Sequence, residues 1–174
     1  MNSIIIQGSS RSEGNTSMIA KIIQESLNTE VIDLKKKHIN SYSYDHENLS
    51  DDFISVINEI IKYDTIIFIT PVYWYSMSGI MKNFFDRITD CLKSEKETGR
   101  KLRGKNMIAI SCGSDGTETE GFFVPFKNSA NYLGMHYLGD IHTWMEKDTP
   151  EHEVLEKIEA FINEIKNKPA YNKK

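Results

Sequence analysis

The chain has few of the residues that mark several common protein classes. It contains only two cysteines, Cys91 and Cys112, and they lie far apart in a sequence of 174 residues. Such isolated cysteines predict free thiols rather than a disulfide framework or a zinc site. Five histidines occur, at His38, His46, His136, His142 and His152. None of them has the helical i, i+4 spacing of paired metal ligands or adjoins a cysteine pair, so no metal site is predicted.

Long apolar runs and a strong net charge are also missing. The longest apolar stretch begins at Thr65 and is much shorter than the roughly 20 residues that a membrane helix needs. The first residues lack the basic and apolar regions of a signal peptide. A net charge of −4 provides no electrostatic footprint for DNA or RNA. We therefore expect one cytoplasmic, soluble domain with no nucleic-acid or membrane partner.

Short apolar segments alternate with amphipathic ones along the chain. Strands are predicted at 3–7, 30–34, 64–70, 107–112 and 135–144. Helices are predicted to start at Thr16, at Asp51 or Asp52, at Ser76 or Ser78, after Gly121 and at Thr149. Pro71 lacks a backbone donor and is expected to help end the third strand. Residues 93–105 are expected to form a charged, solvated connector.

This strict alternation predicts an α/β fold in which helices cover both faces of a parallel sheet. In such sheets ligands bind outside the carboxyl ends of the strands. The loops at 8–17, 71–78 and 113–121 follow the first, third and fourth strands and have the least ordinary sequences in the chain. We therefore predict a binding site where these three loops meet.

The loop at 8–17 has the features of an anion site. It joins a buried strand to a helix start, where unpaired N–H groups and the positive end of the helix dipole converge. The hydroxyls of Ser9, Ser10, Thr16 and Ser17 and the guanidinium of Arg11 can add donors. A dipole contribution is about 0.3–1 kcal/mol, whereas micromolar binding requires about 8 kcal/mol. A ligand held here must therefore make further contacts, and a capped turn with one exposed arginine remains the alternative.

Other phosphate-binding motifs fit this loop poorly. A Walker loop requires lysine where Asn15 stands, and a dinucleotide fingerprint requires glycine where Ser10 stands. A phosphatase loop of the Cys-x5-Arg type requires a cysteine nucleophile, which the loop does not contain.

Three consecutive aromatic residues, Tyr73, Trp74 and Tyr75, follow the third strand. Rings in a loop predict that something covers them, either the flat ring of a ligand or a core edge or subunit interface. Later in the chain, Asp86 and Arg87 fall on the polar side of a predicted helix. For that pair a surface role is at least as well supported as a functional one.

Three segments carry a family resemblance. The sequence GSSRSEGNTS at 8–17, PVYWYSMS at 71–78 and KNFFDR at 82–87 together resemble the NAD(P)H-dependent FMN reductase family of flavodoxin-like oxidoreductases. The resemblance spans about residues 1–145. It implies a flavodoxin-like three-layer sandwich with a five-stranded parallel sheet in the order 2-1-3-4-5, assembled as a homodimer or homotetramer. The FMN-binding domain would cover residues 1–166, followed by a loose basic tail at 167–174.

The resemblance also implies a set of cofactor-binding residues. Ser9, Arg11, Asn15 and Thr16 would bind the FMN phosphate, and the hydroxyls of Ser10 and Ser17 add donors nearby. Pro71, Val72, Tyr73, Trp74 and Tyr75 would border the ribityl chain and ring, with Cys112 and Gly113 on the ring's other side. No catalytic side chain and no metal ligand is implied.

The activity implied is hydride transfer from NAD(P)H through FMN to a small acceptor: a quinone, azo or nitro compound, flavin or ferric chelate. A related branch, the iron–sulfur flavoproteins, has a cysteine cluster after the second strand. Residues 38–50 contain no cysteine here, so FMN would be the sole redox centre. A flavodoxin-type electron carrier and a non-catalytic FMN- or nucleotide-binding module remain alternatives. Arg11 and the modest charge of −4 count against the carrier.

Overall fold

A computed structural model describes residues 1–45, 50–146 and 150–168. Five parallel strands form one sheet in the order β2-β1-β3-β5-β6. Their bounds are β1 Ser3–Gln7, β2 Glu30–Asp33, β3 Thr65–Tyr73, β5 Asn106–Gly113 and β6 His136–Trp144. Counted without the short hairpin strand β4 Ser76–Met77, this is the predicted order 2-1-3-4-5, and the α/β flavodoxin-like fold is confirmed.

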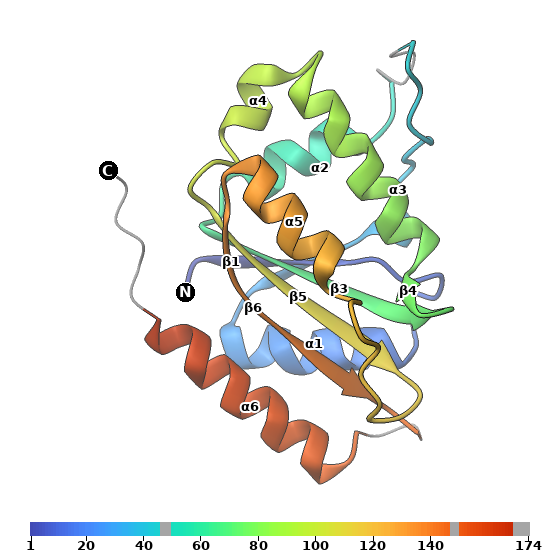
Figure 1. Ribbon diagram of the computed structural model, residues 1–174, viewed down its shortest axis with the longest axis vertical. Coiled ribbons are helices and arrows are strands. Elements are labelled where there is room, and N and C mark those ends of the chain that lie inside the picture. The colour runs from blue at the N-terminus through green and yellow to red at the C-terminus, as the bar shows by residue number, and fades with distance from the viewer. Residues whose placement is uncertain (46–49, 147–149, 169–174) are drawn as a thin grey trace.

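Helices cover both faces of this sheet (Figure 1). Helices α1 Asn15–Leu27 and α6 His152–Asn167 lie on one face. The opposite face carries α2 Phe53–Ile60, α3 Gly79–Arg87 and α5 Val124–Leu133. Short 3-10 turns, η1 Leu34–Lys36 and η2 Ile88–Leu92, follow β2 and α3 respectively, and η2 leads to the short helix α4 Lys96–Arg100.

The central strands are buried on both sides because each face of the sheet has its own core. Along β1, Ile4 and Ile6 contact the core beneath α2, α3 and α5, whereas Ile5 contacts the core beneath α1 and α6. All three side chains are fully buried. Their continuous apolar sequence is what a parallel strand between two helix layers requires.

Pro71 does not end β3, contrary to the sequence-based expectation. The strand continues to Tyr73, and Pro71 is paired in register with Cys112 of β5. On its other side β1 ends at Gln7, which pairs with Ile69. Pro71 lies two residues beyond Ile69, where β1 has already ended. No carbonyl of β1 requires a backbone N–H from β3 at that point, so proline is accommodated without the loss of a ladder hydrogen bond.

The end of β3 forms a hairpin that the sequence pattern did not predict. Strand β4, Ser76–Met77, runs antiparallel to β3 and pairs Tyr73 with Ser76. The helix that follows begins at Ser78, whose hydroxyl oxygen accepts a hydrogen bond from the N–H of Met81 at 3.1 Å. Ser78, and not Ser76, is therefore the residue that caps α3.

Arg87 is not on a solvated helix face, and its predicted surface role is wrong. Its side chain is 1% exposed and bonds to the carboxylates of Asp51 and Asp90 and the carbonyl of Asn40. Its guanidinium also lies 4.7 Å from the ring centroid of Phe53. These contacts fasten the segment before α2 to α3. Asp86, in contrast, pairs with Lys82 on the exposed side of the helix.

The charged segment 93–105 is only partly a solvated connector. It contains α4, where Gly99 lies so close to Cys91 that an added Cβ would meet the Cys91 carbonyl oxygen at 2.0 Å. Leu102 is also buried. Glycine is therefore the residue that this close approach allows.

The last helix starts near its predicted position. Glu151 precedes the first residue of α6 and occupies its N-cap position. The predicted cap Thr149 and the histidine His46 lie outside the described residues, as do the tail residues 169–174. The division into a domain at 1–166 and a loose tail stays a prediction. Within the described residues, no helix is long and apolar enough to cross a membrane.

Candidate functional site

Two adjoining pockets lie at the carboxyl ends of the strands. The inner pocket, of about 210 Å³, is lined by Ser9, Arg11, Gly14, Asn15, Thr16, Pro71, Val72, Tyr73, Cys112, Gly113, Ser114 and Met145. The outer pocket, of about 450 Å³, is lined by Val72, Trp74, Tyr75, Gly113, Ser114, Asp115, Thr117, Thr119 and His142. Because Val72, Gly113 and Ser114 line both, the two pockets adjoin each other. Their position is the one at which parallel α/β sheets bind ligands.

The inner pocket contains the start of α1. Gly14 occupies the N-cap position, so no side chain caps the first N–H groups, and the first turn contains no acidic residue. The positive end of the helix is therefore left for an external anion. Gly8 holds the preceding loop against the sheet, because its N–H bonds the Ile69 carbonyl at 2.9 Å and its carbonyl accepts from the Ser78 hydroxyl at 2.7 Å.

Donors gather around this helix start. Ser9 and Thr16 are each 4% exposed, and the Ser9 hydroxyl oxygen accepts a 3.3 Å hydrogen bond from the N–H of Arg11. An added Cβ on Gly14 would lie 3.5 Å from Nε of Arg11, so the arginine side chain lies close to the helix start. A guanidinium, two hydroxyls and a helix N-terminus together fit a phosphate dianion.

Other predicted residues hold the pocket walls together. The Asn15 side chain donates to the carbonyl of Met145 at 2.9 Å and so connects α1 to the end of β6. The Ser10 hydroxyl lies 2.7 Å from the Tyr73 hydroxyl and connects the first loop to the β3–β4 hairpin. Neither Ser10 nor Ser17 lines either pocket.

The tip of the hairpin supplies aromatic surface to the outer pocket. Trp74 and Tyr75 form the two-residue turn between β3 and β4, with φ values of 47° and 64°. Their side chains are largely exposed, at 93% and 75% respectively. Bulky residues seldom adopt left-handed backbone conformations, and the strain marks this turn as a functional candidate.

A buried histidine supports the opposite wall. His142 lies on β6 opposite Ser111 of β5, and its Nδ1 is 2.8 Å from the Ser111 hydroxyl. Its Nε2 is 2.9 Å from the carbonyl oxygen of Asp115, which can only accept. An added Cβ on Gly113 would meet the His142 ring at 2.8 Å, so this glycine allows the loop to lie directly against the histidine.

Two ionisable groups in the walls have shifted pKa values. N–H and hydroxyl donors from Thr117, with the Ser114 hydroxyl, lower the pKa of the Asp115 carboxyl. Burial raises the pKa of the Cys112 thiol to about 11, so this sulfur is a neutral wall atom at pH 7.

The structure thus brings most of the predicted residues together. The inner pocket gathers Ser9, Arg11, Asn15, Thr16, Pro71, Val72, Tyr73, Cys112 and Gly113, and the outer pocket gathers Trp74 and Tyr75. Sequence reasoning missed Ser114, Asp115, Thr117, Thr119, Gly14, His142 and Met145 as individual lining residues. The polar loop 113–121 pointed to the first four only collectively. Nothing in the sequence indicated His142, because its place depends on the β5–β6 register.

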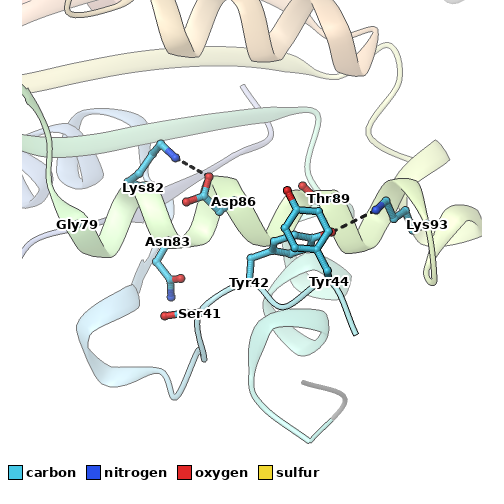
Figure 2. A pocket seen from close by; sticks show the side chains of 9 residues that line it. All are labelled: Ser41, Tyr42, Tyr44, Gly79, Lys82, Asn83, Asp86, Thr89 and Lys93. Carbon is cyan, nitrogen blue, oxygen red and sulfur yellow. Dashed lines mark hydrogen bonds and ion pairs between the residues drawn. The ribbon is translucent and has the colours of Figure 1, made fainter. Parts of the chain in front are cut away.

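A pocket larger than either of these lies elsewhere, along the outer side of α3. It measures about 520 Å³ and is lined by Ser41, Tyr42, Tyr44, Gly79, Lys82, Asn83, Asp86, Thr89 and Lys93. Figure 2 shows Lys82 and Asp86 paired along the helix, and Lys93 bonded to the Tyr42 hydroxyl beside the Tyr44 ring. Gly79 brings the start of α3 into this lining, but the Ser78 hydroxyl already caps that helix, and none of the lining residues lies at the carboxyl end of a sheet strand. Size alone therefore does not identify the functional site.

Comparison with known proteins identifies the family. The sequence model of the NADPH-dependent FMN reductases matches residues 1–150. The chain belongs to this family. Its members are FMN-dependent NAD(P)H oxidoreductases, and the family resemblance expected from the sequence is confirmed. The cofactors of the family, FMN and NAD(P)H, suit the phosphate-binding features and the aromatic surface described above.

One relative and two structures illustrate the likeness. The Bacillus subtilis protein YwqN, named as a candidate NAD(P)H-dependent FMN-containing oxidoreductase, is 28% identical over 149 residues, covering 80% of this chain and 82% of its own. The Trp repressor binding protein of Bacillus subtilis superposes with a TM-score of 0.70 at 22% identity, covering 98% and 99% of the chains. General stress protein 14 of Treponema denticola, solved with FMN, superposes with a TM-score of 0.66 at 14% sequence identity, covering 95% of this chain and 98% of its own. At these identities the structures establish the fold.

Among the residues that the structure describes, no group of three or more histidine, cysteine, aspartate and glutamate side chains is placed to hold a metal ion. The site described above is built instead from hydroxyls, one guanidinium, backbone groups and aromatic rings.

Proposed function

We propose that this protein holds FMN across the inner and outer pockets and uses it to pass hydride from NAD(P)H to a small electron acceptor. The observation that carries the proposal is that an anion-binding pocket adjoins an aromatic one at the carboxyl edge of the sheet and shares lining residues with it. Neither pocket alone offers enough contact for tight binding, but together they match a molecule with a phosphate at one end and a flat ring at the other.

The inner pocket would hold the phosphate. Arg11 would contribute a charge-assisted hydrogen bond, and the hydroxyls of Ser9 and Thr16 would donate from buried positions. Asn15, whose amide is engaged with Met145, would keep α1 in place against the end of β6. Ser10 would act through Tyr73, and Ser17 has no contact that supports a role at this site.

The ribityl chain of FMN, which follows the phosphate, would border Pro71, Val72 and Tyr73, with Cys112 and Gly113 on the other side. Trp74 and Tyr75 would cover the ring region from the hairpin.

When bound, FMN supplies a two-electron carrier that accepts hydride from a nicotinamide. With a quinone as acceptor, the balanced reaction is NAD(P)H plus quinone plus one proton giving NAD(P)⁺ plus hydroquinone. The protein binds and orients both partners, and no side chain is required as acid or base.

An anaerobic mixing experiment tests this proposal. The FMN-loaded protein is mixed with NADH or NADPH, and the visible absorption of the flavin is followed. We expect bleaching within seconds with at least one of them and recovery when a quinone is added. A protein that stays oxidised with both nicotinamides contradicts the reductase and favours a carrier that is reduced by a partner protein.

A colourless protein that gains no flavin spectrum with added FMN contradicts the cofactor assignment itself. That result would favour the non-catalytic nucleotide-binding module as the alternative.

We also propose a homodimer or homotetramer located in the cytoplasm. Exposed apolar side chains at Leu92, Val124 and Tyr132 lie on the α3–α5 side of the sheet and are suited to subunit contact. Both cysteines are free thiols, which fits a reducing compartment. Light scattering coupled to size-exclusion chromatography measures the assembly, and a mass of one chain contradicts it.

A further inference from the structure

The outer pocket has one acid and neither lysine nor arginine among its lining residues. The only basic side chain there is His142, which is buried and hydrogen-bonded at both ring nitrogens, and the acid is Asp115. The same loop carries two more exposed carboxylates, Glu118 and Glu120. Arg11 lines the adjoining inner pocket, where the proposed FMN phosphate would neutralise its charge. The outer pocket is therefore left with a net negative charge when the cofactor is bound.

The Asp115 carboxylate is fixed in place. It accepts hydrogen bonds from the N–H of Thr117 at 2.8 Å and from the Ser114 hydroxyl at 3.2 Å. The backbone of the same residue is held by His142, whose Nε2 donates to the Asp115 carbonyl at 2.9 Å. Donors to the carboxylate lower its pKa, so it is ionised at neutral pH.

The other wall is aromatic and flat. Trp74 and Tyr75 are held at the tip of a two-residue turn in left-handed backbone conformations and line the same pocket as Asp115. Their faces favour planar molecules, because stacked rings attract beyond the effect of burial alone. With the proposed FMN ring lying in this pocket, an acceptor that approaches the ring therefore meets flat ring surface and a negative charge.

We infer that the outer pocket, with the FMN ring lying in it, gives flat acceptors without negative charge access to that ring, and that Asp115 is the residue that rejects anionic ones. This inference rests on the proposed function, since it concerns the acceptor that FMN would reduce. It predicts that neutral quinones are used well and that sulfonated aromatic acceptors are used poorly. Asp115 acts by repulsion across the pocket and takes no part in hydride transfer.

A matched pair of acceptors tests the inference. The FMN-loaded protein is assayed with 1,4-naphthoquinone and with 1,4-naphthoquinone-2-sulfonate, each reduced by NAD(P)H and one proton to its hydroquinone. The quantity compared is the ratio of kcat/KM for the sulfonate over kcat/KM for the neutral quinone. Any difference in reduction potential between the two quinones is constant and cancels when this ratio is compared between variants.

The variant is Asp115→Asn, which retains a carbonyl oxygen to accept from Thr117 while removing the charge. We expect the ratio to rise about fivefold, as removal of one nearby charge in a solvent-exposed site allows. The control is Glu97→Gln on α4, an exposed carboxylate at the opposite edge of the sheet with the same change in net charge. Its ratio is expected to equal that of the unmodified protein.

Two further measurements do not depend on turnover of the variant. Added salt should raise the ratio of the unmodified protein toward that of the Asp115→Asn variant, because salt screens exposed charges. Binding of the redox-inert pair 2-naphthamide and 2-naphthalenesulfonate, followed by the flavin absorption of the oxidised protein, should show the same preference and the same loss of it in the variant.

Equal ratios in the unmodified protein and the Asp115→Asn variant, with turnover intact, would overturn the inference and leave the proposed function standing. Equal binding of the two naphthalene compounds would overturn it as well. Failure of both nicotinamides to bleach the flavin is a different result, because it removes the reductase proposal and this inference together.

Discussion

Arg11 is the only cationic side chain among the residues that line the inner pocket. Replacing it by alanine removes a charge-assisted hydrogen bond of about 1.5–3 kcal/mol. We therefore expect Arg11→Ala to weaken FMN binding about tenfold to 100-fold. Titration of FMN fluorescence with protein measures the change. Lys21→Ala removes one exposed cation from the same helix and serves as the control, and equal affinities in the two variants would refute the phosphate assignment.

The two cysteines make a prediction about reactivity. Burial raises the pKa of the Cys91 thiol to about 12 and that of Cys112 to about 11. At pH 8 both are almost entirely protonated, and the thiol form is a poor nucleophile. We expect neither to react with iodoacetamide in the folded protein and both to react in 6 M guanidinium, as mass spectrometry can show. Rapid modification of Cys112 in the native protein would contradict its burial in the pocket wall.

The turn of the β3–β4 hairpin leads to a stability prediction that distinguishes the effect of backbone strain from the effect of losing the Tyr75 ring. Tyr75 has a φ of 64°, which is unfavourable for any residue with a Cβ. Tyr75→Gly should therefore stabilise the protein by about 1 kcal/mol. Tyr75→Ala removes the same ring but keeps the backbone strain, so it should show no such gain. Urea unfolding of both variants gives the comparison, and equal stability of the two would mean that the turn is not strained.

The buried ion pairs of Arg87, which join α3 to the segment before α2, lead to a second stability prediction. Arg87→Met removes the guanidinium and leaves Asp51 and Asp90 buried without its charge. Loss of one partner from a buried ion pair costs about 3–5 kcal/mol of unfolding free energy. Lys82→Met breaks the exposed pair with Asp86 on the same helix and should cost less than about 1 kcal/mol. Similar losses of unfolding free energy in the two variants would show that the buried ion pairs of Arg87 do not stabilise the fold more than the exposed pair does.

The ion pair between Arg87 and Asp51 also makes the stability of the protein depend on pH. Burial alone would raise the pKa of Asp51, but hydrogen bonds from Arg87 and from the N–H groups of Phe53 and Asn40 outweigh it, and the pKa lies below its ordinary value. The stability that this carboxylate contributes is therefore present above about pH 4 and is lost as the pH falls through the folded-state pKa.

In the Arg87→Met variant the hydrogen bond and charge of Arg87 are lost while burial and the N–H groups of Phe53 and Asn40 remain, so the pKa of Asp51 is higher than in the unmodified protein. The variant therefore loses less of the stability that this carboxylate contributes as the pH falls, and the difference in unfolding free energy between the two proteins should narrow toward acid pH. Urea unfolding from neutral to acid pH measures the difference, and one that is constant with pH would contradict the assignment.

At the scale of the whole molecule, cofactor binding and stability are linked. A ligand that binds only the folded state at 100 times its Kd raises the free energy of unfolding by about 2.7 kcal/mol. We expect FMN at that concentration to stabilise the protein by this amount, measured by urea unfolding. Riboflavin lacks the phosphate and should stabilise less at the same concentration. Equal stabilisation by the two would mean that the inner pocket does not bind phosphate.

The sequence by itself determined the five strands of the parallel sheet, the layers and the three loops of the site. Continuous apolar strands such as Ile4–Ile6 can be satisfied only between two helix layers, and their alternation with amphipathic helices leaves few arrangements other than a parallel sheet. The loops then fall at one edge, because the carboxyl ends of parallel strands share it. For the same reason most of the predicted site residues were found in two adjoining pockets.

Only the tertiary structure decided which polar groups are buried and which residues face each other across strands. Helical periodicity placed Arg87 on a polar face, but that face is covered by a segment 36 residues earlier in the chain. Pro71 reads locally as a strand end, yet the early end of β1 lets β3 continue. His142 reaches the pocket through the register of β6 against β5. Each outcome depends on contacts between distant segments, whereas sequence patterns report only local spacing.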